Sequence, residues 1–310
     1  MRCKILFAIM MMFLCMQVRA QELSSYVESD LLATLHEGEK AALLMVHFGT
    51  TYDETRTKTI DAINAKARAA FPQIEVRESY TSRIILRRLA KKGIRKETPL
   101  QAMLRLRADG YTHLVVQSTH LIDGAEMESL RKDVERVRHL FTEVRVGVPL
   151  LYHVDDAMRV ADILTQRHPA DARKHEHVLF VGHGTHTPAT ALYSEMDYML
   201  KASGHDNYHV GTIEGYPTFD TALRLLKKAK AKRVTLVPFL FVAGDHAAND
   251  ISVEWKEKLE SEGLKTDLHI EGLGEVPQIQ DIFIEHVRTM MTHRVRPVTE
   301  IKDIYSKQKD

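Results

Sequence analysis

The stretch VLFVGHGT at residues 178–185 decides the fold, because an apolar run stops at a Gly-His-Gly-Thr loop and a helical stretch follows over Pro188–Lys201. A buried strand, a short loop and a helix form the repeating unit of α/β proteins. The stretch AALLMVHFGT at residues 41–50 has the same plan, and a helical segment over Asp53–Phe71 comes after it. The two Gly-Thr pairs lie 135 residues apart, which suggests a repeated unit.

A second pair of matching segments supports a duplication. The strand Leu114–Val116 leads into a loop that ends at Glu126, and the strand Val234–Val237 leads into a loop that ends at His246. In both loops a glycine stands two positions before the ionisable residue. A helical segment follows each loop, at Glu128–Leu140 and at Asn249–Glu262. The chain is therefore predicted to contain two copies of one unit.

The alternation of strands and helices defines the expected architecture. The weaker strands are expected at Ile74–Arg77, Val144–Val148, Tyr208–Ile213 and Asp267–Ile270. The pattern predicts the α/β class, with two similar doubly wound domains, each with a roughly four-stranded parallel sheet flanked by helices. Ligands of such sheets bind beyond the carboxyl ends of the strands. We therefore expect a cleft between the two domains, lined by the residues that follow the strands.

The chain is expected to divide into five parts. They are a signal peptide at 1–20, an N-terminal segment at 21–40, an N-terminal α/β domain at 41–165, a C-terminal α/β domain at 166–295 and a polar tail at 296–310. The pattern leaves the oligomeric state open, with a homo-oligomer as one outcome.

The first residues have the features of an export signal. Arg2 and Lys4 precede an apolar run over Ile5–Met16, and a small-residue cleavage site ends at Ala20. The run is too short to span a bilayer, since a spanning helix needs about 20 residues. We therefore expect no membrane span and a periplasmic mature protein, with an uncleaved amphipathic anchor as the alternative.

Composition excludes several kinds of site and partner. Both cysteines, Cys3 and Cys15, lie in the leader, so the rest of the chain has no thiolate ligand, cysteine nucleophile or disulfide. The 43 basic and 42 acidic residues nearly balance, which argues against a nucleic-acid partner. Phosphate-loop and dinucleotide fingerprints are absent from the sequence, so no nucleotide cofactor is expected.

Three ionisable residues that follow predicted strands form a candidate metal site. His183 ends a strand between two glycines, which would let a ligand approach the backbone closely. Glu126 and His246 occupy equivalent points of the two copies, so the duplication should place them on either side of the cleft. Two imidazoles and one carboxylate suit Co²⁺, Fe²⁺, Ni²⁺ or Zn²⁺ and leave coordination positions open. The alternatives are that Glu126 caps a helix and that His246 lies on a surface loop.

Other histidines are weaker candidates. His47 lies inside a strand and is expected to be a core or rim residue. His186 is close enough in sequence to assist His183, and His120, three residues past a strand, could support a ligand from behind.

Several strings closely resemble the anaerobic sirohydrochlorin cobaltochelatases of early cobalamin synthesis. They are VGHGT at 181–185, EGYP at 214–217 and FVAGDHAAND at 241–250, and the similarity extends over residues 41–291. The leader departs from the cytoplasmic members and resembles the periplasmic branch of these class II chelatases. Periplasmic relatives similar to haem-binding proteins have a histidine where this chain has Ala125, so haem binding is not predicted.

The resemblance implies an ATP-independent insertion of Co²⁺ into a tetrapyrrole held in the cleft. It makes His183 the proton acceptor and a metal contact, with Glu126 and His246 as the remaining metal ligands. Insertion expels two pyrrole protons, and a neutral imidazole, with an ordinary pKa of about 6.5, can accept them. The ring carboxylates should attract basic or hydroxyl groups at the cleft mouth. The candidate substrate-binding residues are Ser82, Arg83, Thr185 and Glu214.

Three other functions fit the same pattern. The first is a chelatase that inserts iron for sirohaem or haem metabolism. The second is a periplasmic tetrapyrrole or metal carrier that has lost turnover. The third is a periplasmic solute receptor, since those proteins also have two α/β lobes.

Overall fold

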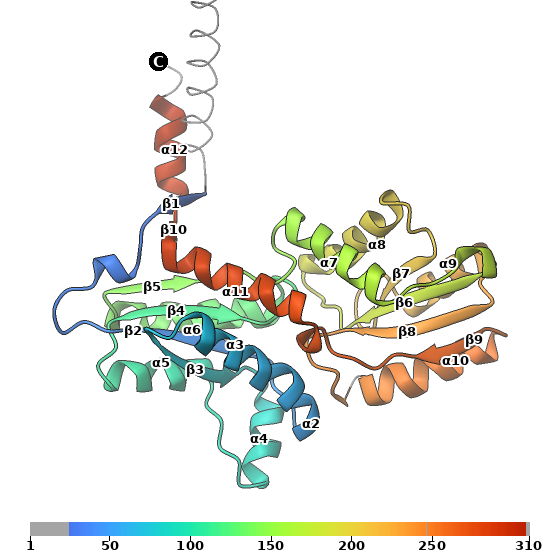
Figure 1. Cartoon of the computed structure of the whole chain (residues 1–310), viewed down its shortest axis with the longest axis horizontal. Coiled ribbons are helices and arrows are strands. Elements are labelled where there is room, and N and C mark those ends of the chain that lie inside the picture. The colour runs from blue at the N-terminus through green and yellow to red at the C-terminus, as the bar shows by residue number, and fades with distance from the viewer. Residues whose placement is uncertain (1–24, 246, 308–310) are drawn as a thin grey trace, which may run out of the picture.

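Two four-stranded parallel sheets make up the frame of the computed structural model, which describes residues 25–245 and 247–307 (Figure 1). The predicted leader lies outside these residues. The first sheet has the order β3-β2-β4-β5, with β2 Ala41–His47, β3 Glu75–Tyr80, β4 His113–Ser118 and β5 Glu143–Val146. The second has the order β7-β6-β8-β9, with β6 Glu176–Gly182, β7 Tyr208–Thr212, β8 Arg233–Phe239 and β9 Lys265–Leu268. Both sheets thus have one topology, and the predicted fold class is confirmed.

The central strands are apolar because both of their faces are covered. All seven residues of β2 are buried, and the six apolar ones alternate between two apolar clusters. Leu43 and Met45 pack on one side, in the same cluster as Phe180 of β6. Leu44 packs on the other side, in a cluster confined to the first half of the chain. Parallel strands buried on both faces have this near-continuous apolar sequence.

The helices follow the strands in both halves. The first half contains α2 Asp53–Arg56, a π-helical segment Thr57–Asp61, α3 Ala62–Ala70, α4 Arg83–Lys91, α5 Pro99–Ala108 and α6 Ala125–Val137. The second contains α8 Ala191–Ala202, α9 Phe219–Lys228, a π-helical segment Ala247–Trp255 and α10 Lys256–Ser261. Short 3₁₀ turns lie at Leu32–Thr34, Arg138–Leu140, Ala172–Lys174, Pro188–Thr190 and Leu273–Glu275.

Two helices are exchanged between the halves. Helix α7, Val154–Arg167, follows the last strand of the first sheet but contacts α8. At the end of α7, the carbonyl of His168 accepts a hydrogen bond of 2.8 Å from the Tyr208 hydroxyl of β7. Helix α11, Pro277–Thr292, follows the last strand of the second sheet but contacts α3 and β4 (Figure 1). The division at residues 165 and 166 expected from the sequence therefore separates both helices from the sheets that they cover. The apolar face of a helix shows that the helix is buried, but it does not show against which sheet the helix packs.

The ends of the described chain form an accessory element. Strand β1, Tyr26–Glu28, pairs antiparallel with β10, His293–Val295, and so joins the segment expected at 21–40 to the end of α11. Within the tail expected at 296–310, residues 298–307 form helix α12, which has no buried residue and projects from the body (Figure 1).

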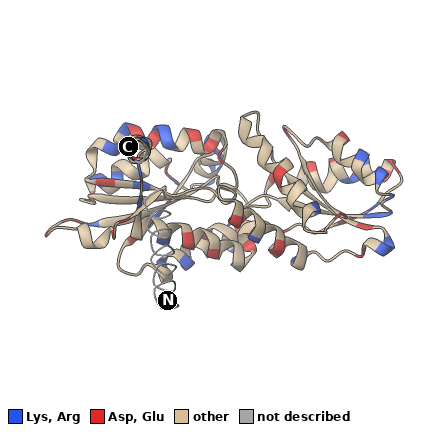
Figure 2. Ribbon diagram, turned by 90° about the horizontal axis from the view of Figure 1, so that it is seen from above, with Lys and Arg blue, Asp and Glu red and all other residues tan. Residues whose placement is uncertain are grey.

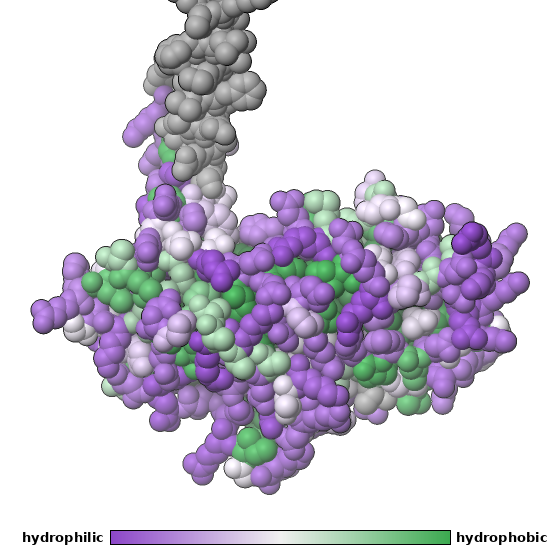
Figure 3. Space-filling model, viewed as in Figure 1, coloured by the Kyte–Doolittle hydropathy of each residue, from purple (hydrophilic) through white to green (hydrophobic). Residues whose placement is uncertain are grey.

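Charge and hydropathy are mixed over the surface. Basic and acidic residues alternate along both halves (Figure 2), in keeping with the near-neutral composition. Apolar groups lie scattered among hydrophilic residues on the face shown in Figure 3. Among the described residues, none of the helices combines the length and apolarity needed to cross a membrane.

Arg145 of β5 anchors the end of α11 on the first sheet. Its side chain is buried, and its Nη1 donates to the carbonyls of Ser29, Met290 and His293 at 2.7, 2.9 and 3.2 Å. The last carbonyls of a helix have no partner within the helix and carry partial negative charge. A buried guanidinium therefore satisfies both the hydrogen bonding and the charge of this helix end.

Replacement of Arg145 by methionine should lower the free energy of unfolding by about 3 kcal/mol, because several buried carbonyls lose a charged donor. Urea denaturation measures the change. Arg136→Met is the matched control. Because Arg136 is exposed on α6, its replacement should change the free energy of unfolding by less than about 0.5 kcal/mol. If the two variants are equally stable, apolar packing alone holds α11 in place.

Candidate functional site

A cavity of about 440 Å³ lies where the carboxyl ends of the two sheets meet. Its wall comes mainly from the segments that follow β2, β4, β6 and β8, at residues 48–52, 119–122, 183–186 and 240–242. The volume is in the usual range for sites that bind small molecules, about 300–1,000 Å³. The predicted cleft between the two domains is therefore present at the expected strand ends.

The two halves meet in a nearly symmetric way. A Cβ placed on Gly244 would lie 3.6 Å from Oγ1 of Thr50, and one on Gly124 would lie 3.7 Å from Oγ1 of Thr185. Thr50 and Thr185 are equivalent residues of the two copies, and so are the two glycines. The Gly-Thr loop of each copy thus abuts the glycine loop of the other, as in a pseudo-two-fold pair.

His183 is held at the cavity by the close packing around its two neighbours. A Cβ on Gly184 would lie 1.4 Å from the carbonyl oxygen of Glu214, and one on Gly182 would lie 2.2 Å from the ring of Tyr193. The glycines are thus needed for packing within the protein, whereas the sequence suggested that they make room for a ligand. Nδ1 of His183 lies 3.1 Å from the Gly184 carbonyl, which can only accept. Nδ1 must therefore carry the hydrogen of this bond. In the neutral ring the lone pair is then on Nε2, which is the atom that can take a proton or a metal.

Glu126 lies in the first turn of α6 and lines the cavity. Its carboxylate accepts no hydrogen bond from any described residue, so the alternative role as a helix cap is not seen there. The carboxylate acts on His120, which also lines the cavity: burial lowers the pKa of His120 to about 4, and the nearby Glu126 charge opposes that shift. An uncommitted carboxylate beside a neutral imidazole is able to bind a cation.

The other predicted residues differ in position. Ser82 and Thr185 line the cavity, and the hydroxyl oxygen of each accepts from a nearby main-chain amide: Ser82 Oγ from Ile85 N at 3.3 Å and Thr185 Oγ1 from Thr187 N at 3.2 Å. Each hydroxyl can still donate its hydrogen. Glu214 lines the cavity and is exposed. Arg83 is exposed on α4 and does not line the cavity.

His246 lies outside the described residues, but its neighbour Asp245 lines the cavity. The Tyr52 hydroxyl donates to Asp245 Oδ1 at 2.7 Å, and Arg88 pairs with the other carboxylate oxygen. Tyr52 and Arg88 belong to the first half of the chain and Asp245 to the second, so this contact ties the two halves together beside the cavity. The sequence reasoning missed all three residues, because nothing in their spacing links Tyr52 and Arg88 to a residue more than 150 positions away.

The family comparison agrees with this geometry. The cobalt chelatase (CbiK) family matches residues 41–292, which cover both sheets and the cavity. The chain belongs to the CbiK cobalt chelatase family.

Two curated relatives of this chelatase family are similar over most of their length. A sirohydrochlorin cobaltochelatase from Salmonella typhimurium is 36% identical over 261 residues, which are 83% of this chain and 98% of the relative. The sirohydrochlorin cobaltochelatase CbiKC from Nitratidesulfovibrio vulgaris is 34% identical over 254 residues, which are 80% of this chain and 89% of the relative.

The fold is also similar to that of solved chelatases. The structure of SirB from Bacillus subtilis with Fe³⁺ has a TM-score of 0.59 and 16% identity, and it covers 81% of this chain and 96% of its own. The sirohydrochlorin chelatase SirB from Bacillus subtilis subspecies spizizenii in complex with cobalt has a TM-score of 0.56 and covers 81% and 95%. At this identity the likeness shows the shared fold.

A buried polar network lies behind the cavity of this CbiK family member. The Glu78 carboxylate can only accept, so Asn64 Nδ2 donates to it at 2.7 Å and Asn64 Oδ1 faces His47 Nε2 at 3.0 Å. Nε2 of His47 therefore carries the hydrogen, and Nδ1 accepts from the hydroxyl of Thr119 at 3.0 Å. Thr119 lines the cavity. His47 is thus a core residue with both nitrogens bonded, as the sequence suggested.

The His47→Gln variant should show a weaker dependence of stability on pH. Burial lowers the pKa of His47 to about 4, below an unfolded value near 6.5, so the unfolded chain takes up this proton first as the pH falls. The stabilisation that is present above pH 6.5 is therefore lost between about pH 6.5 and 4. From pH 7 to 5 this residue should account for about 2 kcal/mol of the loss.

Urea unfolding at several pH values gives the slope, which is compared between variants so that a constant packing loss cancels. His139→Gln serves as the control because His139 is exposed. An unchanged slope in His47→Gln would mean that the other buried histidines carry the whole effect.

Proposed function

We propose that this chain is an ATP-independent chelatase that inserts Co²⁺ into sirohydrochlorin or a closely related tetrapyrrole. The observation that carries the proposal is that Glu126 and His183 line one cavity at the strand ends of a CbiK family member. The activity named for its relatives at 34% and 36% identity supports the same reaction. The cobalt in the complex of SirB supports Co²⁺ as the metal delivered, and Fe²⁺, Ni²⁺ and Zn²⁺ are the competing metals.

The proposed mechanism follows from charge balance. A divalent cation enters the ring as two pyrrole protons leave, so the cavity must hold the cation and accept protons. Glu126 supplies a carboxylate to which no residue of the described chain donates a hydrogen bond, and His183 supplies a ring nitrogen with a lone pair. We propose His246 as the third metal ligand. Ligands of these types can be exchanged one at a time for ring nitrogens, so the metal is held without being trapped.

The cavity wall also suits a flat ring with acidic side chains. Phe48 and Ile84 are exposed apolar side chains that line the cavity, and Phe241 adds an aromatic ring. Large apolar groups that stay exposed at a cavity are typical of ligand sites. For the ring carboxylates we propose Ser82 and Thr185 as hydroxyl donors.

The charged residues at the rim are proposed to have different roles. Arg88 lines the cavity and is the better candidate for the cationic contact with the ring carboxylates that the sequence assigned to Arg83. Glu214 is an acid, so we propose that it attracts the incoming cation rather than the ring carboxylates.

Replacement of His183 by alanine should lower the insertion rate by about 10²–10⁴-fold, the usual contribution of a general base. The melting temperature should change little, because His183 lies on a loop at the end of a strand. Steady-state absorbance of the metallated ring measures turnover with sirohydrochlorin and each of Co²⁺, Fe²⁺, Ni²⁺ and Zn²⁺.

His186→Ala is the matched control, because His186 also lines the cavity on the same loop. A His183→Ala variant that stays within a few-fold of the parent, beside an inactive His246→Ala variant, would place the base elsewhere. A protein that takes up one equivalent of ring and metal and then stops would be the carrier and not the enzyme.

We propose that the protein acts in the periplasm after cleavage following Ala20. The support is the order of basic start, apolar run and small exit in residues 2–20. Intact-mass measurement of the exported protein should give a chain that begins at Gln21. A cytoplasmic product that still begins at Met1 would contradict export.

A further inference from the structure

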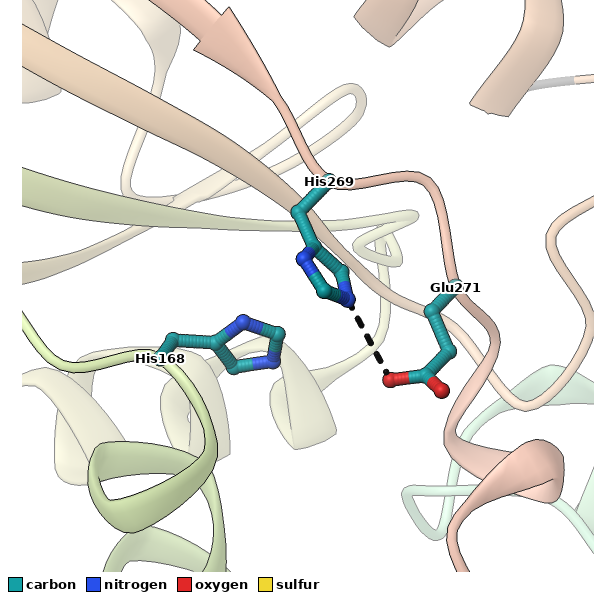
Figure 4. Close-up of side chains that lie close together, drawn as sticks. All are labelled: His168, His269 and Glu271. Atoms are coloured by element: carbon teal, nitrogen blue, oxygen red, sulfur yellow. Dashed lines mark ion pairs between the residues drawn. The ribbon is translucent and has the colours of Figure 1, made fainter.

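A second group of possible metal ligands lies outside the cavity. His168 follows the end of α7, and His269 and Glu271 follow β9. Figure 4 shows the two imidazole rings and the carboxylate converging on one space. None of the three residues lines the cavity of the candidate active site. They are brought together only because α7 packs against the second sheet.

The distances suit a metal ion with modest adjustment. One ligand atom from each residue can be chosen so that all lie within 4.8 Å of one another. Nε2 of His269 and Oε2 of Glu271 are already 3.5 Å apart. Bonds of about 2.1 Å in a tetrahedral site place ligand atoms about 3.4 Å apart. One pair thus has the required spacing, and a rotation of the His168 ring would complete the set.

The main chain that carries these side chains is fixed. The Tyr208 hydroxyl donates to the carbonyl of His168, and the amide of His269 donates to Leu236 of β8 at 3.0 Å. The amide of Gly272 donates to Glu275 at 2.9 Å just after Glu271. A ligand set on a fixed main chain loses little conformational entropy when a metal binds.

The imidazole of His168 is available to a metal. No described residue makes a hydrogen bond to the ring nitrogens of His168, although the residue is buried. His269 is exposed, which leaves a path for a cation and for water.

Arg167 is the competitor for the carboxylate. Its guanidinium pairs with both oxygens of Glu271. A carboxylate oxygen has two lone pairs, so each oxygen can accept from Arg167 and keep a second lone pair for a metal. Hydrogen bonds of this kind also orient the carboxylates of known metal sites.

We propose that His168, His269 and Glu271 form a second metal site for a divalent cation of the Zn²⁺, Co²⁺ and Ni²⁺ class. Two imidazoles and one carboxylate with open positions select such borderline metals over Mg²⁺ and Ca²⁺, which prefer oxygen ligands. The bound ion joins the end of α7 to the segment between β9 and α11, where the chain crosses back to the first half. The proposal does not depend on the chelatase activity.

The test uses the mature full-length protein with the cleft ligands removed, as the Glu126→Ala, His183→Ala, His246→Ala triple variant. Co²⁺ alone is the probe, followed by its visible absorption and by calorimetric titration, and circular dichroism verifies folding. The triple variant should bind one equivalent of Co²⁺ and should melt at a higher temperature with the metal than without it. His269→Ala in this background should weaken binding by more than about tenfold, since even outer partners of a metal site contribute that much.

His269 is exposed, so its replacement should not disturb folding, and His139→Ala is the matched exposed control. A triple variant that binds no Co²⁺ overturns the proposal, and so does a His269→Ala variant that binds as the triple variant does. If Glu271→Gln in the triple-variant background binds Co²⁺ as tightly as the triple variant does, Glu271 pairs with Arg167 only and the proposed three-ligand site is wrong.

Discussion

The burial of β2 and β6 on both faces is the constraint on which the rest of the structure depends. A parallel strand covered by helices on both sides has no room for unpaired polar groups, because each would lose its hydrogen bonds to water. His47 is tolerated within β2 only because Asn64 and Thr119 bond both of its nitrogens. Side chains that must bind a charged or exchangeable partner are therefore confined to the loops just beyond the strands.

The duplication turns this constraint into a site. Each sheet alone would offer an open edge, whereas two sheets that face each other enclose a cavity between their carboxyl ends. The exchange of α7 and α11 holds the halves in this relation, since each helix starts from one sheet and packs on the other. Apolar residues of both sheets consequently belong to one cluster that also contains residues of α11. The pair of Arg88 and Asp245 then links the halves at the surface beside the cavity.

The parts that the sequence predicted are those that depend on local pattern. The alternation of strands and helices, the cleft and the placement of Glu126 and His183 at it follow from apolar runs, the repeat and the rule for strand ends. The sequence predicts Arg83 at the cleft mouth, but Arg88, five residues later on α4, is the arginine that lines the cavity. The side chain of Arg145 could not be matched with the end of α11, because its partners are carbonyls of the main chain, which have no sequence signature.

The two proposed sets of metal ligands differ in how firmly their carboxylates are held, and this difference separates what each can do. Within the described residues Glu126 has no hydrogen-bond partner, so in the proposed mechanism it is able to move with a cation as ring nitrogens replace the protein ligands. Glu271 is bound on both oxygens by Arg167, and its neighbours are fixed through their main chain. A cation bound there would have to break a charged pair in order to leave with a substrate. An ion at His168, His269 and Glu271 is therefore suited to hold the crossover of the chain in place, and transfer into a ring belongs to the cleft.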